Sequence, residues 1–403
     1  MLYRAAVVLA GDGIPVADGA VRVEGERIAA VGPAAELPPL PGEEVRDLGP
    51  QVLSPGFINA HCHLDYSRMR GLLPGQRFVR WIESINALKR SFSDDDYLEA
   101  IAYGFTLLQQ GGTTTVANIE SFPELLPRLG PPPIRAWWFL ELTDLRQRVP
   151  QDEYYFGMLS FFQERTDWLG GFGLSPHSPY TASLDLYHLA KRCSEEYGMP
   201  FTTHIAESLE EQEMFLYGQG PLYEMMHKLG RDTSDCGQGS PLSHLVENGL
   251  LTPRCLAVHL NYLQEYDWPL LVASGASVVH CPKSHAYFGY APFELERMQG
   301  EGINLCLATD SLASNTSLDL RAEARAAIAA HPGLTDADAW RMITRNPARA
   351  LGQAGRLGEI SPGALADLVA FPFLPHGDPF ASLLESAGRP GLLVVNGQAL
   401  SVP

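Results

Sequence analysis

Positive charge and long apolar runs are both scarce in this sequence. Its 403 residues carry 29 Lys and Arg against 47 Asp and Glu, a formal net charge of −18. Such a chain would repel a phosphate backbone, so we expect no nucleic-acid partner. No apolar run approaches the roughly 20 residues that a membrane helix needs, so we expect no membrane partner either.

Paired cysteines are also lacking. The six cysteines form no C-x-x-C motif, and three of them lie in apolar, strand-like runs, which indicates reduced thiols. Near the N-terminus, the apolar stretch 5–10 is followed at once by Gly-Asp-Gly and is too short for the core of a secretory signal. We therefore expect a cytoplasmic protein.

The two ends of the chain share one sequence pattern. Short alternating segments separated by Gly, Pro and Asp occupy residues 1–52, and the pattern returns in residues 356–403. It is typical of short antiparallel strands. We predict that residues 1–52 and 356–403 together form one small β-sandwich domain.

Between residues 53 and 355, eight apolar, strand-like runs alternate with segments of helical composition. This alternation predicts an α/β fold with a parallel sheet, and eight repeats predict a (β/α)₈ TIM barrel. Active sites of such barrels gather at the C-terminal ends of the strands. Polar residues follow every run: His61 and His63, Asn118 and Glu120, Glu141, His177, His204 and Glu207, His259, His280, and Asp310.

His61 and His63 stand two residues apart at the end of the first run, so a strand directs both imidazoles to one face, where they can share a metal ion. His204 and Asp310 are the best-placed further ligands, although Asp310 could instead be a turn or helix-cap residue. Three imidazoles and a carboxylate favour one divalent ion, Zn²⁺ first and Fe²⁺ or Mn²⁺ next.

Glu207 is the candidate acid/base. A metal site of this kind activates water near neutral pH, and a nearby carboxylate can relay the proton to the leaving group. The alternative is a solvent-facing carboxylate at a helix start. His259 could either complete the metal shell or bond to the attacking hydroxide. No lysine follows the fourth run, so a bridging carbamate and a second metal are not indicated.

Together, the Pro-Gly-Phe-Ile-Asn-Ala-His61-Cys-His63 opening, His204-x-x-Glu207, His259 and the Thr309–Asn315 motif resemble the amidohydrolase superfamily. The most similar branch contains the cytosine deaminases, chlorohydrolases and methylthioadenosine/S-adenosylhomocysteine deaminases. The resemblance spans nearly the whole chain.

This resemblance implies that His61, His63, His204 and Asp310 hold the metal, that Glu207 shuttles protons, and that His259 is the partner of the attacking hydroxide. It also implies substrate contacts for Glu83, which follows Trp81, and for His177 in a His-Ser-Pro-Tyr motif. Ser311 and Arg148 are further candidate substrate contacts. The aromatic loop 280–290 departs from the family pattern, and it could stack on a flat ring or pack against the barrel rim.

The predicted activity is hydrolytic release of ammonia from an amino-substituted heteroaromatic ring. We expect a small-molecule substrate that contains adenine: aminodeoxyfutalosine, S-adenosylhomocysteine, methylthioadenosine or adenosine. The same site would suit a chlorohydrolase or a cyclic amide hydrolase, and a non-catalytic binding protein on a decayed barrel is the alternative from another class. The family resemblance also suggests a homodimer.

Overall fold

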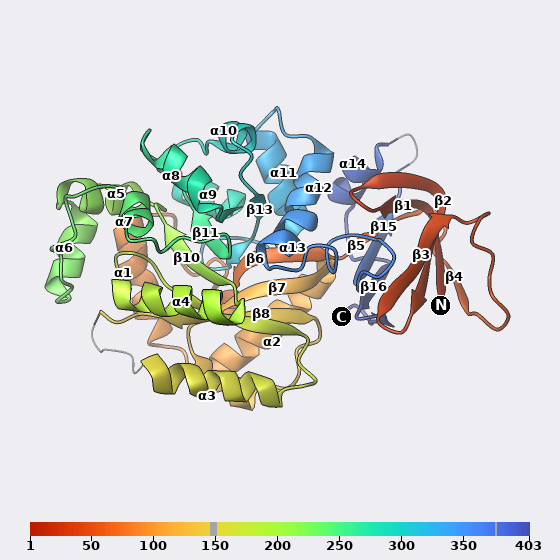
Figure 1. Ribbon diagram of the computed structural model, residues 1–403, viewed down its shortest axis with the longest axis horizontal. Coiled ribbons are helices and arrows are strands. Elements are labelled where there is room, and N and C mark those ends of the chain that lie inside the picture. The colour runs from red at the N-terminus through yellow and green to blue at the C-terminus, as the bar shows by residue number, and fades with distance from the viewer. Residues whose placement is uncertain (146–150, 375–376) are drawn as a thin grey trace.

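The computed structural model describes residues 1–145, 151–374 and 377–403. Figure 1 shows two parts, a large barrel with helices around it and a smaller sheet beside it that contains both chain termini. In the described part of the chain, no helix combines the length and the apolar character that crossing a membrane requires.

Strands from both chain ends meet in one sheet, as the shared sequence pattern predicted, but the sheet is mixed and not purely antiparallel, because β1 pairs parallel with β4 and β5. Its order is β17-β16-β15-β5-β1-β2-β3, with β4 beside β1. The ends are joined where β15 pairs antiparallel with β5, Val369 opposite Ser54. The strands are β1 (Leu2–Ala10), β2 (Ile14–Glu24), β3 (Arg27–Pro33), β4 (Val45–Asp47), β5 (Gln51–Pro55), β15 (Leu368–Pro372), β16 (Leu392–Val395) and β17 (Gln398–Ala399). The division into 1–52 plus 356–403 and 53–355 stays a prediction.

The eight predicted runs form the barrel strands. The parallel order is β13-β12-β11-β10-β9-β8-β7-β6-β14. These strands are β6 (Phe57–His63), β7 (Thr113–Glu120), β8 (Arg135–Leu142), β9 (Gly170–Pro176), β10 (Phe201–Ile205), β11 (Cys255–His259), β12 (Ser277–His280), β13 (Leu305–Leu307) and β14 (Asp310–Ser311).

The eighth run is split into β13 and β14, and this split closes the curled sheet. β13 pairs with β12, whereas β14 pairs with β6, Asp310 opposite Cys62. One short stretch of chain therefore contacts both edges and brings the last strand end beside the first. The predicted barrel is confirmed.

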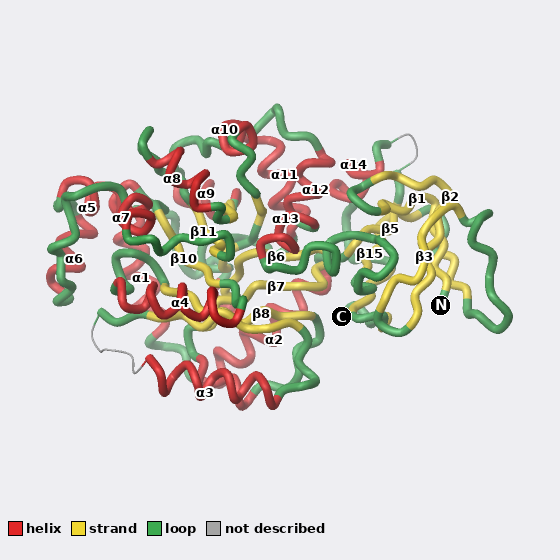
Figure 2. The backbone as a smooth tube through the Cα atoms, in the orientation of Figure 1, coloured by secondary structure: helices red, strands yellow, loops and turns green. Residues whose placement is uncertain are grey.

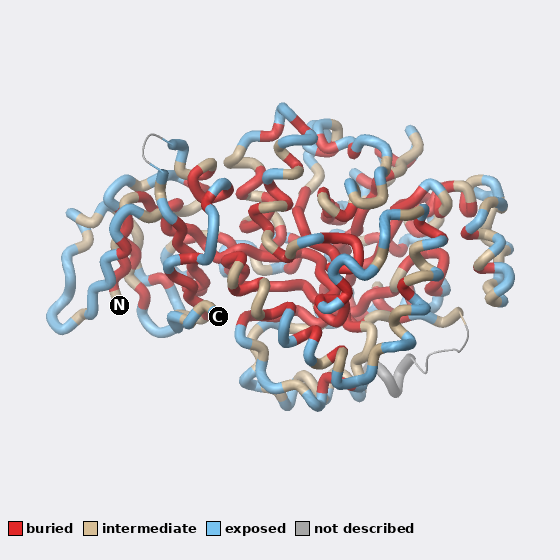
Figure 3. Tube along the Cα trace, turned by 180° about the vertical axis from the view of Figure 1, so that it is seen from behind, coloured by how far each residue is buried: buried red, intermediate tan, exposed pale blue. Residues whose placement is uncertain are grey.

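Helices cover the outside of the barrel, and the buried part of the chain follows the strands (Figures 2 and 3). α5 and α6 lie at the end of the molecule farthest from the terminal sheet (Figure 1). The helices are α1 (Phe78–Lys89), α2 (Asp94–Gln110), α3 (Gln151–Glu164), α4 (Leu184–Tyr197), α5 (Leu209–Tyr217), α6 (Pro221–Lys228), α7 (Pro241–Glu247), α8 (Asp267–Ser274), α9 (Pro282–Phe288), α10 (Leu295–Gly300), α11 (Leu320–Ala330), α12 (Asp336–Met342), α13 (Arg345–Ala350) and α14 (Pro379–Glu385), with short 3₁₀ helices at Leu64–Met69 and Pro123–Arg128.

Candidate metal centre at the barrel mouth

His61 and His63 lie at the carboxyl end of β6, a strand that is buried throughout. Strand alternation directs both side chains into the barrel, where their ring centroids are 4.9 Å apart. The closure by β14 brings Asp310 to them: its Oδ1 lies 3.6 Å from His61 Nε2 and 3.8 Å from His63 Nε2. These three residues can offer one ligand atom each to a single ion.

His204, at the end of β10, completes the predicted ligand set. Its ring centroid is 4.9 Å from that of His61. His204 Nδ1 lies 2.7 Å from the carbonyl oxygen of His177 and must therefore carry a proton that it donates. This hydrogen bond leaves Nε2 free to bind a metal, an arrangement common for histidine ligands. His259 forms a second possible ligand group with His61 and His204.

The chemistry of these residues fits a divalent ion. Both ring nitrogens of His61 and the Nδ1 atom of His63 are buried without a hydrogen-bond partner in the described part of the chain. Such atoms cost free energy unless something else satisfies them. Three imidazoles and one carboxylate form a ligand set typical of zinc.

Two serines orient the Asp310 carboxylate. Ser284 Oγ donates to Oδ2 at 2.7 Å and Ser314 Oγ donates to it at 3.0 Å, so Oδ1 faces the histidines. Burial alone would raise the pKa of Asp310, but the neighbouring His61 imidazole holds it below its ordinary value. The carboxylate is therefore ionised and ready to bind a cation.

Glu207 and His259 face each other beside this cluster. Glu207 Oε2 lies 3.7 Å from His259 Nε2, and the Tyr290 hydroxyl lies 3.5 Å from Glu207 Oε1. Burial, followed by the negative charges of Asp310 and Glu211, raises the pKa of Glu207 well above that of an ordinary glutamate. Burial is also the main reason why the pKa of His259 falls to about 3, so this imidazole is neutral.

Of the candidate substrate contacts, His177 and Ser311 lie at the cluster, whereas Glu83 lies on the helix α1. The ring of His177 lies 4.9 Å from that of His204, and Ser311 pairs with His63 across the closing strand. Glu83 is half exposed on α1 and forms an ion pair with Arg80, at 2.8 Å. Arg148 falls outside the described residues.

Not every polar strand end points to the cluster. The His280 ring stacks on Phe293 with centroids 3.8 Å apart, and Asn118 Oδ1 accepts the backbone N–H of Leu64. Sequence reasoning also missed Lys89, which donates to the Tyr66 hydroxyl at 2.6 Å while the Tyr66 ring stacks on His63. Lys89 is the last residue of a surface helix, so its sequence gave no signal of this inward position.

Aromatic side chains of α1 and α9 pack together. Phe288 at the end of α9 packs on Phe78 and Trp81 of α1, with ring centroids 5.8 and 5.3 Å apart. The Tyr287 hydroxyl donates to the carbonyl oxygen of Pro74 at 2.8 Å. The segment after β12 therefore packs on α1 and on the chain just before it through these rings.

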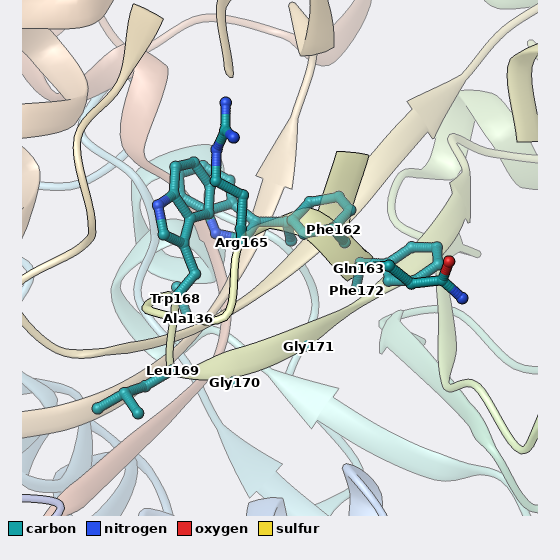
Figure 4. Close-up of a pocket in the computed structure, with 10 residues that line it drawn as sticks. Ala136, Phe162, Gln163, Arg165, Trp168, Leu169, Gly170, Gly171 and Phe172 are labelled. Atoms are coloured by element: carbon teal, nitrogen blue, oxygen red, sulfur yellow. The ribbon is translucent and has the colours of Figure 1, made fainter. Parts of the chain in front are cut away.

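A separate aromatic pocket lies at the opposite end of the strands, under α3 (Figure 4). It is lined by Phe162, Trp168 and Phe172 and by Gly170, the first residue of β9. Because it is at the amino ends of the strands, it does not belong to the metal cluster.

Comparison with known proteins agrees with this geometry. The sequence profile of the amidohydrolase family matches residues 52–129 and 156–400, and that of an imidazolonepropionase-like composite domain of bacteria matches residues 19–39. A 5-methylthioadenosine/S-adenosylhomocysteine deaminase of Pyrococcus abyssi is 27% identical over 417 residues, covering 99% of this chain and 93% of that protein.

Solved structures are also similar, among them two deaminases. An adenosine deaminase from Xanthomonas campestris with bound zinc matches with a TM-score of 0.83 at 26% identity, over 99% of this chain and 92% of that one. Helicobacter pylori aminofutalosine deaminase, in complex with methylthio-coformycin, matches with a TM-score of 0.87 at 22% identity, over 99% and 100% of the two chains. Since the family profile covers most of its length, the chain belongs to the amidohydrolase family.

Proposed function

We propose that this protein is a zinc-dependent deaminase of a small molecule that contains adenine. Water adds to the ring carbon that bears the amino group, and ammonia leaves, so that the ring gains a carbonyl oxygen. The observation that carries the proposal is the buried pair of Glu207 and His259, 3.7 Å apart, beside the His/Asp cluster. The similarity to deaminases of adenine compounds supports this choice of substrate class.

One divalent ion would be held by His61, His63, His204 and Asp310. When bound, zinc lowers the pKa of water and polarises the reacting group as a Lewis acid. The unpartnered nitrogens of His61 support this assignment. In this proposal His259 does not bind the metal; its neutral ring forms a hydrogen bond with the attacking oxygen.

Glu207 is the proposed proton carrier. It accepts the proton of the attacking water at a carboxylate oxygen and delivers it to the departing amino group. A carboxyl whose pKa is raised by burial holds a proton more readily near neutral pH, which suits a group that must both take and return it. An exposed glutamate would release the proton to solvent instead.

The proposed substrate contacts are residues near Glu207 and His259. His177 and Ser311 lie at the cluster, and they are the proposed contacts nearest to the reacting ring. Glu83 and Arg148 remain proposed contacts, Glu83 after release from Arg80. A homodimer likewise remains a proposal.

Ammonia release by the zinc-loaded protein tests the proposal. The panel contains methylthioadenosine, S-adenosylhomocysteine, adenosine, aminodeoxyfutalosine and an aminotriazine, with E207Q as the matched variant. We expect turnover of at least one adenine compound, retained zinc in E207Q, and a loss of about 10²–10⁴-fold in its kcat. If the wild-type protein released no ammonia from any compound of the panel, or if E207Q were fully active, the proposal would be contradicted.

A further inference from the structure

Glu211 lies completely buried in the first turn of α5, four residues after Glu207. Its carboxylate binds two consecutive backbone N–H groups: Oε1 accepts from Ala206 at 3.0 Å and Oε2 accepts from Glu207 at 2.8 Å. Its own backbone N–H donates to Ser208 Oγ at 3.1 Å. The side chain therefore bridges back to the residue that carries the proposed proton shuttle.

The backbone here has an unusual shape. Ala206 has a φ of +51°, in the left-handed region that residues other than glycine seldom adopt. Successive N–H groups around such a residue converge and form a concave site for an anion. The Glu211 carboxylate occupies this site, so it stabilises the conformation that sets the direction of the Glu207 side chain.

The other side of the same segment is held by the loop after β11. Asn261 Nδ2 donates to the Glu207 carbonyl oxygen at 2.9 Å, and the backbone N–H of Tyr262 donates to the Ala206 carbonyl oxygen at 3.1 Å. This loop directly follows His259. The segments that contain Glu207 and His259 are thus joined by hydrogen bonds. Among the described residues, Glu211 is the one side chain that accepts from the backbone N–H groups of both residue 206 and residue 207.

We infer that Glu211 is a positioning residue for the Glu207 carboxylate, acting through the backbone N–H groups of Ala206 and Glu207. The inference rests on the proposed function, which assigns proton transfer to Glu207. Burying a carboxylate is costly, and burial raises the pKa of Glu211 to about 7 against the opposing effect of its backbone hydrogen bonds. Since an apolar side chain would fill the same space without that cost, the carboxylate is explained by the N–H groups that it binds.

The kinetic test compares E211Q, E211D and the control E213Q, which changes a partly exposed carboxylate on the same helix. Gln can accept only one of the two N–H groups and places its own NH₂ against the other, whereas Asp is one methylene too short to reach both. We expect kcat to fall by about 10- to 100-fold in E211Q and less in E211D, with KM and zinc content unchanged. E213Q should match the wild type.

A double-mutant cycle separates positioning from general stability. If Glu211 acts only through Glu207, E211Q should lower kcat by less than about twofold when it is introduced into E207Q. An undiminished loss in the E207Q background, or a wild-type kcat in E211Q, would overturn the inference.

Amide hydrogen exchange gives a readout that needs no substrate. The N–H groups of Ala206 and Glu207 should exchange faster in E211Q and E211D than in E213Q, because their acceptor is lost. Faster exchange in a protein that deaminates nothing would refute the proposed function and leave the Glu211 contact standing. Unchanged exchange would refute the contact whatever the activity.

Discussion

Ser284 should determine how tightly this protein holds its metal, although it is not a ligand. In S284A the 2.7 Å hydrogen bond to Asp310 Oδ2 is lost, and only Ser314 remains to orient the carboxylate. Both serines are fully buried, so water cannot easily replace the missing donor. The Asp310 carboxylate would then be free to rotate away from the direction in which Oδ1 faces His61 and His63.

The expected magnitude is that of one hydrogen bond to a charged group, about 1.5–3 kcal/mol. The hydrogen bond from Ser284 also stabilises the metal-free protein, so its loss should change the free energy of zinc binding by at most that amount. Loss of an outer partner of a metal ligand typically weakens binding by about 10- to 100-fold, which corresponds to about 1.4–2.7 kcal/mol. We therefore expect the zinc Kd of S284A to rise by about that factor.

Competition with a chromogenic chelator measures the Kd directly, without any assumption about the substrate. S243A is the matched control, because Ser243 is equally buried in α7 and its hydroxyl donates within its own turn, to the carbonyl oxygen of Ser240. A wild-type Kd in folded S284A, or an equal rise of the Kd in S243A, would refute the argument that the serine acts through Asp310.

Two other predictions concern stability. Removing zinc with a chelator should lower the unfolding midpoint, and adding zinc back should restore it, because a ligand at about 1,000 times its Kd stabilises the folded state by about 4 kcal/mol. H61A should show no such shift. A wild-type midpoint that does not respond to the chelator would argue against a metal at this site. R135A should lower the free energy of unfolding by about 3–5 kcal/mol in urea titrations, because it leaves the buried Asp367 carboxylate without its 3.0 Å partner, whereas a loss below about 1 kcal/mol would mean that solvent reaches Asp367.

The sequence was sufficient to predict the barrel, and it predicted histidines and an aspartate at the carboxyl ends of the strands, where the structure brings His61, His63 and Asp310 together. Each apolar run ends in a polar residue, and parallel strands must bring their carboxyl ends to one side. His61 and His63 add the strand period of two, which directs both into the barrel. These are local signals combined with one topological rule, and they do not depend on side-chain detail.

The residues that orient the cluster were beyond this reasoning. Ser284 lies in α9 and Ser314 follows Asp310 by four residues, so they are 30 residues apart in the sequence and meet only in the folded structure, at the Asp310 carboxylate. Glu211 lies in the acidic stretch Glu-Glu-Gln-Glu, where helix periodicity gives no reason to distinguish a buried carboxylate from a solvated one. Its role depends on the left-handed φ of Ala206, which nothing in the alanine itself predicts.

Backbone strain in this molecule is concentrated where the chemistry is proposed. Of the six residues other than glycine with positive φ in the described chain, four follow or end barrel strands at the cluster: Ala206, His259, Leu260 and Asp310. Each such residue costs about 1–3 kcal/mol, which is large against a typical folding free energy of about 5–15 kcal/mol. The strain persists because buried hydrogen bonds hold the backbone in these conformations. Glu211 accepts from the backbone N–H groups of residues 206 and 207, and Asn59 and Asn315 donate to Thr309, next to Asp310.

These contacts link stability to function. Regular β-geometry would continue the strand direction and leave each terminal side chain alternating in and out of the barrel, whereas a left-handed residue turns the chain over the mouth. Substitutions in the buried polar frame should therefore affect metal binding or turnover more than global stability, because they release strain while they remove a hydrogen bond.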